Sequence, residues 1–210
     1  MSSQEKFHVQ RNDSREVFNR DAINNLLDSE YVAHVGFIDQ DINQPFVIPM
    51  GYSRDGDRIL LHGSTGSRMM MQIAKGIDIC VTVTKLNAIV VARSAYNSSM
   101  NYESVMVFGK ARVLKDSEKD VALERITEKL IPGLWGYGRS ITAKENAGTL
   151  IVELSMDKIS AKSRTGDPVD EDEDLELPIW AGLLPINTSF GAPVTAANSQ
   201  SIPVPPHIKG

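Results

Sequence analysis

One short segment of the chain combines glycines, hydroxyl side chains and a cation in an order that favours phosphate binding. It follows the strand-like run 59–61 and consists of His62, Gly63, Ser64, Thr65, Gly66, Ser67 and Arg68. Free backbone N–H groups in such a loop, the positive end of the following helix and the Arg68 guanidinium would together bind a phosphate. The Gly-Lys-Ser/Thr sequence of a P-loop is absent, so the segment is not a Walker motif. An ordinary glycine-rich turn at the start of a helix is the alternative.

His62 is the candidate catalytic residue because it ends a strand beside this loop, where a neutral imidazole can donate one hydrogen bond and accept another. His34 lies within a predicted strand and is expected to be structural. No Gly-x-Ser-x-Gly elbow is present, so Ser64 and Ser67 are predicted to bind phosphate and not to act as nucleophiles. The His, Asp and Glu residues show no metal-ligand spacing, which predicts no metal site.

Cys80 is the only cysteine of the chain, so a disulfide within one chain is excluded. It lies in the strand-like segment 77–83, where a small, buried core residue is expected. The N-terminal residues contain no apolar core of a secretory signal, and no apolar stretch has the length of a membrane span. The sequence therefore predicts a cytoplasmic protein that has no membrane partner.

Charge is distributed unevenly along the 210 residues, whose net charge is −5. Seven acids and no base lie between residues 167 and 176, and without these acids the remainder carries a charge of +2. No dense basic stripe is present, so a nucleic-acid partner is not expected. The acidic run predicts a solvated linker, with a binding tail as the alternative.

The pattern of apolar residues predicts a mainly β domain over residues 15–165, between a polar arm (1–14) and an acidic, proline-rich extension (166–210). Helices are predicted at 19–29, from the glycine loop to about 75, and at 117–130. Strands are predicted at 31–38, 45–52, 59–61, 77–84, 88–95, 102–114 and 149–156. Because most of these strands are joined by hairpins, the sequence predicts an antiparallel barrel with peripheral helices.

Two of these strands carry special residues. Pro49 cannot donate a hydrogen bond to a neighbouring strand, so we expect it at a sheet edge, at a bulge or facing a ligand. Gly109 would allow the long strand 102–114 to bend.

Four motifs with a specific order and spacing suggest a family. They are Pro45–Tyr52, Leu60–Gly63 with Gly66–Arg68, Tyr102–Gly109, and Leu177–Pro185. Together they resemble the FMN-binding split-barrel proteins of the pyridoxamine 5′-phosphate oxidase superfamily, most closely the nitroimidazole-resistance, flavin-nucleotide-binding branch. The resemblance covers most of residues 15–190 and implies an antiparallel split β-barrel.

The resemblance also implies where the cofactor lies. The strand 46–51 would contact the flavin ring through its backbone, the loop 62–68 would bind the FMN phosphate, and residues 102–104 would approach the flavin from the other subunit. FMN would then lie at the interface of a homodimer. The cofactor residues implied are Val47, Ile48, Pro49, Met50, Gly51, His62, Gly63, Ser64, Gly66, Ser67, Arg68, Tyr102, Glu103 and Ser104.

The function implied is that of a nitroreductase-like, FMN-dependent oxidoreductase acting on a small organic acceptor. The alternatives are a flavin-binding protein without turnover and a split-barrel protein that binds haem or a deazaflavin in the same groove. Pyridoxamine phosphate oxidases proper carry basic residues where this chain has Met50 and Met69, and they end in an Arg-containing substrate motif that is missing here. These departures argue against oxidation of a vitamin B6 phosphate.

Overall fold

The computed structural model describes residues 15–17 and 19–208, so the predicted polar arm lies outside the described residues. Its strands are β1 (Val32–Asp39), β2 (Gln44–Asp55), β3 (Arg58–Ser64), β4 (Asp78–Val91), β5 (Ser99–Lys110), β6 (Arg112–Val113), β7 (Thr149–Ser155), β8 (Ile159–Arg164) and β9 (Gly182–Pro185). Its helices are α1 (Arg20–Ser29), α2 (Arg68–Ala74), α3 (Asp116–Leu130), α4 (Leu134–Tyr137) and α5 (Ala143–Gly148), with short 3-10 turns η3 (Asp172–Asp174) and η4 (Ala197–Ser199).

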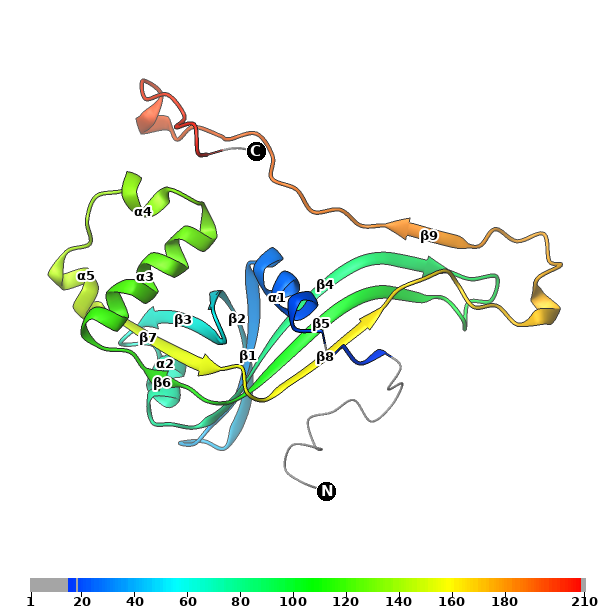
Figure 1. Ribbon diagram of the computed structural model, residues 1–210, viewed down its shortest axis with the longest axis horizontal. Helices are drawn as coiled ribbons and strands as arrows, with labels where there is room; N and C mark the ends of the chain where they lie inside the picture. The colour runs from blue at the N-terminus through cyan, green and yellow to red at the C-terminus, as the bar shows by residue number, and fades with distance from the viewer. Residues whose placement is uncertain (1–14, 18, 209–210) are drawn as a thin grey trace.

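The strands form a single antiparallel sheet that curls into a half-barrel (Figure 1). The strand order is β6-β7-β3-β2-β1-β4-β5-β8, and β9 pairs with β4 outside this path. This arrangement confirms the predicted antiparallel split barrel with peripheral helices. None of the helices in the described part of the chain is long and apolar enough to cross a membrane.

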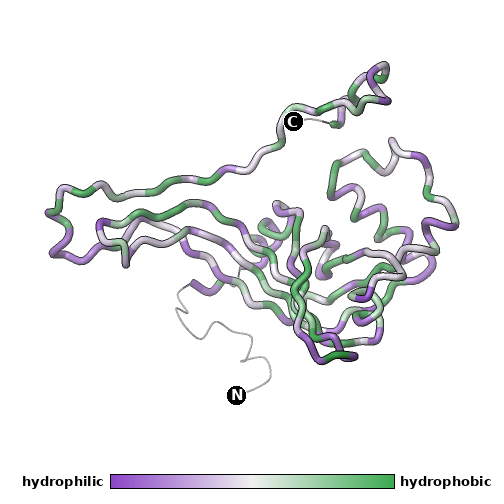
Figure 2. Tube along the Cα trace, turned by 180° about the vertical axis from the view of Figure 1, so that it is seen from behind, coloured by the Kyte–Doolittle hydropathy of each residue, from purple (hydrophilic) through white to green (hydrophobic). Residues whose placement is uncertain are grey.

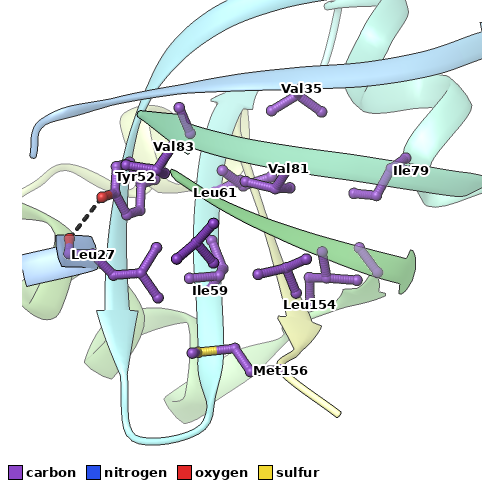
Figure 3. Close-up of a cluster of buried hydrophobic side chains, with 14 of the residues drawn as sticks. Leu27, Val35, Tyr52, Ile59, Leu61, Ile79, Val81, Val83, Leu154 and Met156 are labelled. Carbon is purple, nitrogen blue, oxygen red and sulfur yellow. Dashed lines mark hydrogen bonds between the residues drawn. The ribbon is translucent and has the colours of Figure 1, made fainter. Parts of the chain in front are cut away.

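The core lies inside the curl of the sheet because every second strand residue is apolar and buried. Along β1, Ala33, Val35 and Phe37 point inward, while the residues between them point outward. Figure 3 shows part of this core, which includes Leu27, Val35, Tyr52, Ile59, Leu61, Ile79, Val81, Val83, Leu154 and Met156. A smaller cluster packs α3 against the other side of β3 and β7, and consists of Leu60, Leu114, Ala122, Ile126 and Ile151.

The Tyr52 hydroxyl connects the sheet to the end of α1. It donates a hydrogen bond to the carbonyl oxygen of Leu27 at 2.6 Å (Figure 3). Burial raises the pKa of the Tyr52 phenol well above its usual value, with a contribution from Glu30, so the hydroxyl stays a donor. The ammonium group of Lys129 on α3 donates to the same carbonyl oxygen at 3.2 Å and also to that of Asp28. The C-terminal carbonyls of α1 are thereby paired.

Two strand boundaries differ from the prediction. The segments predicted as separate strands at 77–84 and 88–95 form one strand, β4, because β5 pairs along its whole length and a register shift between Leu86 and Ala88 absorbs the polar Asn87. The predicted strand 102–114 is interrupted after Lys110. Gly109, with φ of +152°, redirects the chain there, and only Arg112 and Val113 resume pairing as β6.

The C-terminal extension, residues 166–208 as described, is more ordered than a solvated linker. It contributes β9, which pairs with Ala88 to Val91 of β4, and it then runs as an extended segment toward α4 (Figure 1). Phe190 meets Tyr31 edge to face with ring centroids 5.6 Å apart, and His207 meets Tyr137 at 5.1 Å. Within the acidic run 167–176, the prediction of solvated side chains is wrong for Asp170, which is buried against Arg93, whereas Asp167, Glu171, Asp172, Glu173 and Glu176 are exposed.

Apolar residues occur along the whole extension, as Figure 2 shows by colour. Many of them have no cover within one chain. Large side chains that remain exposed here are Val169, Leu175, Leu177, Ile179, Trp180, Leu184, Ile186, Phe190, Val194, Ile202 and Val204. Exposed apolar residues on this scale are typical of a surface that contacts another molecule.

Candidate flavin and haem site

The outward side of β1, β2 and β4, which we call the outer face, carries Gly36 and Gly51 among larger side chains. On β1 it begins with Val32 and His34 and continues through Gly36 to Ile38. Gly36 pairs with Val47 of β2 on one side and with Cys80 of β4 on the other. Glycine and small side chains leave the backbone accessible, so a planar ring could approach it closely.

A cavity of about 470 Å³ opens on the outer face toward the turn between β1 and β2. Its lining is mostly apolar and includes Gly36, Ile38, Val47, Cys80 and Phe108. This volume lies within the range of small-molecule pockets. The prediction that Cys80 is a core residue is wrong: its neighbours Ile79 and Val81 fill the core, and strand alternation therefore turns Cys80 outward into this cavity.

Along the predicted cofactor strand 47–51, the same alternation places successive side chains on opposite faces of the sheet. Val47 and Pro49 are exposed on the outer face, whereas Ile48 and Met50 pack against the core. Gly51 has no atom within 4 Å of the position that a Cβ would occupy. Because β2 pairs with β3 only from Tyr52 to Asp55, the stretch before it has an unpaired edge on that side. This confirms the edge position expected for Pro49.

The loop 64–67 is a tight turn whose N–H groups are largely occupied. Thr65 N donates to the Gly148 carbonyl at 2.9 Å, Ser67 N to the Ser64 carbonyl at 2.9 Å, and Gly66 N to Ser64 Oγ at 3.2 Å. The expected loop of several free donors is therefore not formed, because the turn uses them to close itself. The first-turn N–H groups of α2, at residues 68–70, have no partner among the described residues.

The Arg68 guanidinium forms an ion pair with a buried acidic residue. Its Nε lies 2.5 Å from Oδ2 of Asp39, whose side chain is fully buried, and its guanidinium carbon lies 5.5 Å from the Phe46 ring centroid. Burial alone would raise the pKa of the Asp39 carboxyl, but the ion pair with Arg68 and the hydrogen bond from the Asp41 backbone outweigh it and hold that pKa below its usual value. The charge of Arg68 is thus partly compensated within the chain.

Sequence reasoning missed Asp39, because the predicted strand 31–38 ends just before it. A usable signal was present, because Asp39 continues the inward phase of Val35 and Phe37 along β1. A carboxylate in that phase must be buried, and a buried carboxylate needs a cationic partner.

His62 and His34 both lie on the outward side of their strands. His62 shares the side of β3 that carries Leu60 and pairs with Ile151 of β7, next to the point where β2 and β3 separate. Desolvation lowers the pKa of His62, which favours the neutral ring. His34 is exposed beside Pro49, so the prediction that it has a structural role finds no support in its packing. Neither imidazole has a hydrogen-bond partner among the described residues.

Tyr102, Glu103 and Ser104 lie elsewhere in the sheet. They pair with β4 and β8, and Glu103 accepts a hydrogen bond from Asn87 at 3.1 Å. In the strand order, β4, β1 and β2 separate β5 from β3, so one chain does not bring these residues to His62. The structure therefore groups residues 47–51 with 62–68, and leaves 102–104 apart.

A comparison with family sequence models settles the relationship that this geometry suggests. The model described as pyridoxamine 5′-phosphate oxidase matches residues 19–163, which is most of the chain. The chain belongs to this family. None of the curated proteins matches it in sequence.

Two solved structures of the pyridoxamine 5′-phosphate oxidase fold are similar to this family member over nearly its whole length. The flavocytochrome Anf3 from Azotobacter vinelandii is 36% identical with a TM-score of 0.90, covering 97% of this chain and 94% of that one. The FAD and heme binding protein from Mycobacterium smegmatis is 37% identical with a TM-score of 0.88, covering 92% and 95%.

A Bacteroides thetaiotaomicron protein named for resistance to 5-nitroimidazole antibiotics shares the fold at 20% identity. Its TM-score is 0.60, and the match covers 70% of this chain and 85% of that one. The match to Anf3 covers 97% of this chain and therefore includes the C-terminal extension, whereas the match to the family model ends at residue 163. The extension is therefore a feature that this family member shares with Anf3.

Proposed function

We propose that this protein is a flavin-dependent oxidoreductase that also binds haem and acts as a homodimer. The observation that carries the proposal is the similarity of 36–37%, extension included, to a flavocytochrome and to a FAD and heme binding protein. Both names join a flavin with haem, and the M. smegmatis name specifies FAD. FAD is accordingly the flavin we favour, in place of the FMN implied by the sequence motifs.

The flavin would lie on the outer face against the exposed backbone of residues 47–51. Val47, Pro49 and Gly51 leave room for a ring there. The phosphate groups would be bound by Arg68 and by the first-turn N–H groups of α2. When bound, the flavin supplies the redox chemistry, and the protein supplies position, electrostatics and exclusion of water.

The described residues also fit a haem. An imidazole that ligates iron must be unprotonated at the ligating nitrogen. Two imidazoles without a hydrogen-bond partner among the described residues lie on the outward side of the sheet, His34 on β1 and His62 on β3. His62 suits this role because desolvation lowers the pKa of its ring, which favours the neutral form. The mostly apolar cavity beside Val47 and Phe108 would exclude water from a macrocycle edge. A bound haem would supply one-electron chemistry.

A second subunit would complete the site. Tyr102, Glu103 and Ser104 are separated from His62 by three strands within one chain, so a partner is the route by which they could meet the flavin. The exposed outer-face residues Val32 and Val47 would be covered in the same step. Burial of such a surface is the usual driving force for a permanent homodimer.

The test is the absorption spectrum of the purified protein, followed by chromatography of the released flavin and a pyridine haemochrome assay. We expect bound FAD and a haem Soret band. Anaerobic addition of NADH or NADPH, or of dithionite as a chemical donor, followed by an organic acceptor or oxygen, then tests turnover. A protein with flavin but no turnover would be a flavin carrier, and one that binds neither cofactor would refute the proposal.

A further inference from the structure

We propose that Asp39 is a positioning residue whose buried carboxylate holds the Arg68 guanidinium in the orientation that binds a flavin phosphate. This inference rests on the proposed flavin function. It adds Asp39 as a residue that would not contact the ligand but would determine how well Arg68 binds it.

The first observation is the burial of Asp39. Its side chain has no exposed surface, and its carboxylate accepts a hydrogen bond from Asp41 N at 2.9 Å and one from Gln72 Nε2 at 3.4 Å, besides the ion pair with Arg68. A buried carboxylate costs free energy that an apolar residue in the same place would not. Because the other inward residues of β1 are apolar, a carboxylate here needs a reason beyond packing.

The second observation is that the Arg68 guanidinium is exposed and only partly paired among the described residues. Its side chain is 53% exposed, and its shortest contact with Asp39 is made through Nε. The guanidinium carbon lies 5.5 Å from the Phe46 ring centroid, within the range of a cation–π contact. The two Nη groups have no partner within the described part of the chain. A planar guanidinium held at one edge and free at the other presents two parallel donors, which is the geometry that phosphate oxygens favour.

The third observation concerns the neighbouring charges. Asp41, the nearest other carboxylate on this turn, accepts a hydrogen bond from Gln72 at 2.7 Å and pairs with Lys75 at 3.3 Å. It is therefore engaged elsewhere and does not compete for the free edge of Arg68.

The experiment compares FAD with riboflavin, which has the ring but no phosphate. Apo-protein is titrated with each flavin for wild type, Arg68→Ala, Asp39→Asn, the double variant, and Asp41→Asn as the matched control. We expect Arg68→Ala to weaken FAD binding about 10- to 100-fold and Asp39→Asn on the order of tenfold. The double variant should bind FAD no worse than Arg68→Ala, and riboflavin affinity should be equal in all variants.

Each contrary result has a separate meaning. Equal losses of FAD and riboflavin in Asp39→Asn would show a merely structural role and overturn the inference. Normal FAD binding by Asp39→Asn with weakened binding by Arg68→Ala would overturn it while the flavin function stands. Unchanged FAD binding by Arg68→Ala would overturn it and place the phosphate elsewhere. A wild type that binds no flavin would refute the proposed function itself.

A second variant covers the case in which Asp39→Asn does not fold. Arg68→Lys keeps the charge, but the three N–H donors of an ammonium diverge from one nitrogen, so they cannot pair with Asp39 and also present the two parallel donors of a guanidinium to a phosphate. We expect it to lose FAD affinity nearly as much as Arg68→Ala does. Wild-type affinity in Arg68→Lys would overturn the inference, because charge alone would then suffice.

Discussion

Asp170 and Arg93, 77 positions apart in the sequence, meet through two hydrogen bonds that anchor the C-terminal extension. Oδ1 of Asp170 accepts from the Arg93 backbone N–H at 2.7 Å, and Oδ2 accepts from Arg93 Nη1 at 2.8 Å. The Asp170 side chain is 2% exposed. The contact joins the start of the extension to the end of β4, just before β9 adds itself to the edge of that strand.

We expect Asp170→Ala to loosen the extension, because it leaves the partly buried Arg93 guanidinium without its partner. The local cost should be about 1–3 kcal/mol, and it should appear as faster proteolytic cleavage within residues 166–181. Asp172→Ala, which removes an exposed carboxylate from the same acidic run, is the control and should leave the rate unchanged. Equal cleavage of both variants would show that β9 pairing alone fixes the extension.

The same contact should depend on pH. Burial tends to raise the pKa of Asp170, but the hydrogen bonds from Arg93 outweigh it and the pKa lies below its usual value. A carboxyl whose pKa is lowered by folding stabilises the protein above the unfolded pKa and loses this effect as the pH falls through the folded one. Proteolysis by an acid-active protease should therefore accelerate in strongly acidic buffer for wild type, and less so for Asp170→Ala.

Tyr52→Phe should destabilise the barrel by about 1–2 kcal/mol. It removes the buried hydroxyl that pairs the Leu27 carbonyl and leaves that oxygen with Lys129 alone. Chemical denaturation followed by far-UV circular dichroism measures the change. Tyr96→Phe is the matched control, since the Tyr96 side chain is 93% exposed and its loss should cost less than about 0.5 kcal/mol. Indistinguishable midpoints for the two variants would contradict this account of the α1 contact.

His62 is expected to orient a cofactor or substrate without transferring a proton. No described acidic residue pairs with it, and Gln preserves a donor and an acceptor but cannot titrate. We therefore expect His62→Gln to retain flavin and most reductase activity, and His62→Ala to lose more. Stopped-flow flavin reduction and turnover with a nitroaromatic or quinone acceptor measure this. If both variants abolish turnover equally with flavin bound, proton transfer by His62 is required.

Haem loading separates the two histidines. If His62 ligates the iron, His62→Gln should lose the Soret band while the flavin spectrum persists, whereas His34→Gln should keep both. The opposite pattern would assign the ligand to His34.

The stability of the wild-type protein should also depend on the protonation of His62. Because burial lowers the pKa of His62, acidification below about pH 6.5 should destabilise the wild type, since the unfolded chain takes up a proton that the folded chain resists. His62→Gln should lack this contribution in melting experiments between pH 5 and 8.

Truncation after Gly166 should leave a homodimer by multi-angle light scattering. The expectation follows from the outer face, whose exposed Val32, Ile38 and Val47 remain in the shortened chain. A monomer would instead show that the extension, with exposed side chains such as Trp180, clasps the partner subunit. The concentration dependence of the mass separates a weakened dimer from a lost one.

The barrel could be predicted from sequence because its strands alternate clearly. The hairpin at 53–57 and the helix after Asn19 also follow local rules: Gly56 has a positive φ, and the Asn19 side chain accepts from the N–H groups of Asp21 and Ala22. What local rules could not supply was β9. Its four residues form a strand only because the edge of β4 is available to pair with them.

The sequence predicts which residue types the candidate site contains better than it predicts how these residues are arranged. The sequence indicates that residues 62–68 contain phosphate-binding groups, but whether their N–H donors are free depends on Gly148, more than 80 positions away. In the same way, Arg68 looked like an uncommitted cation until the turn placed Asp39 beneath it. Partners that come from distant segments are set by tertiary folding and leave no local pattern.

The glycines on the outer face have an evolutionary consequence. At Gly36 and Gly51, a ring bound as we propose would meet main chain, and main chain is the same whatever the neighbouring side chains are. Such a surface discriminates poorly between one flat heterocycle and another, so selectivity must come from residues at its margin. Descendants of one ancestor could then exchange prosthetic groups through a few marginal substitutions, while the barrel that supports them stays unaltered.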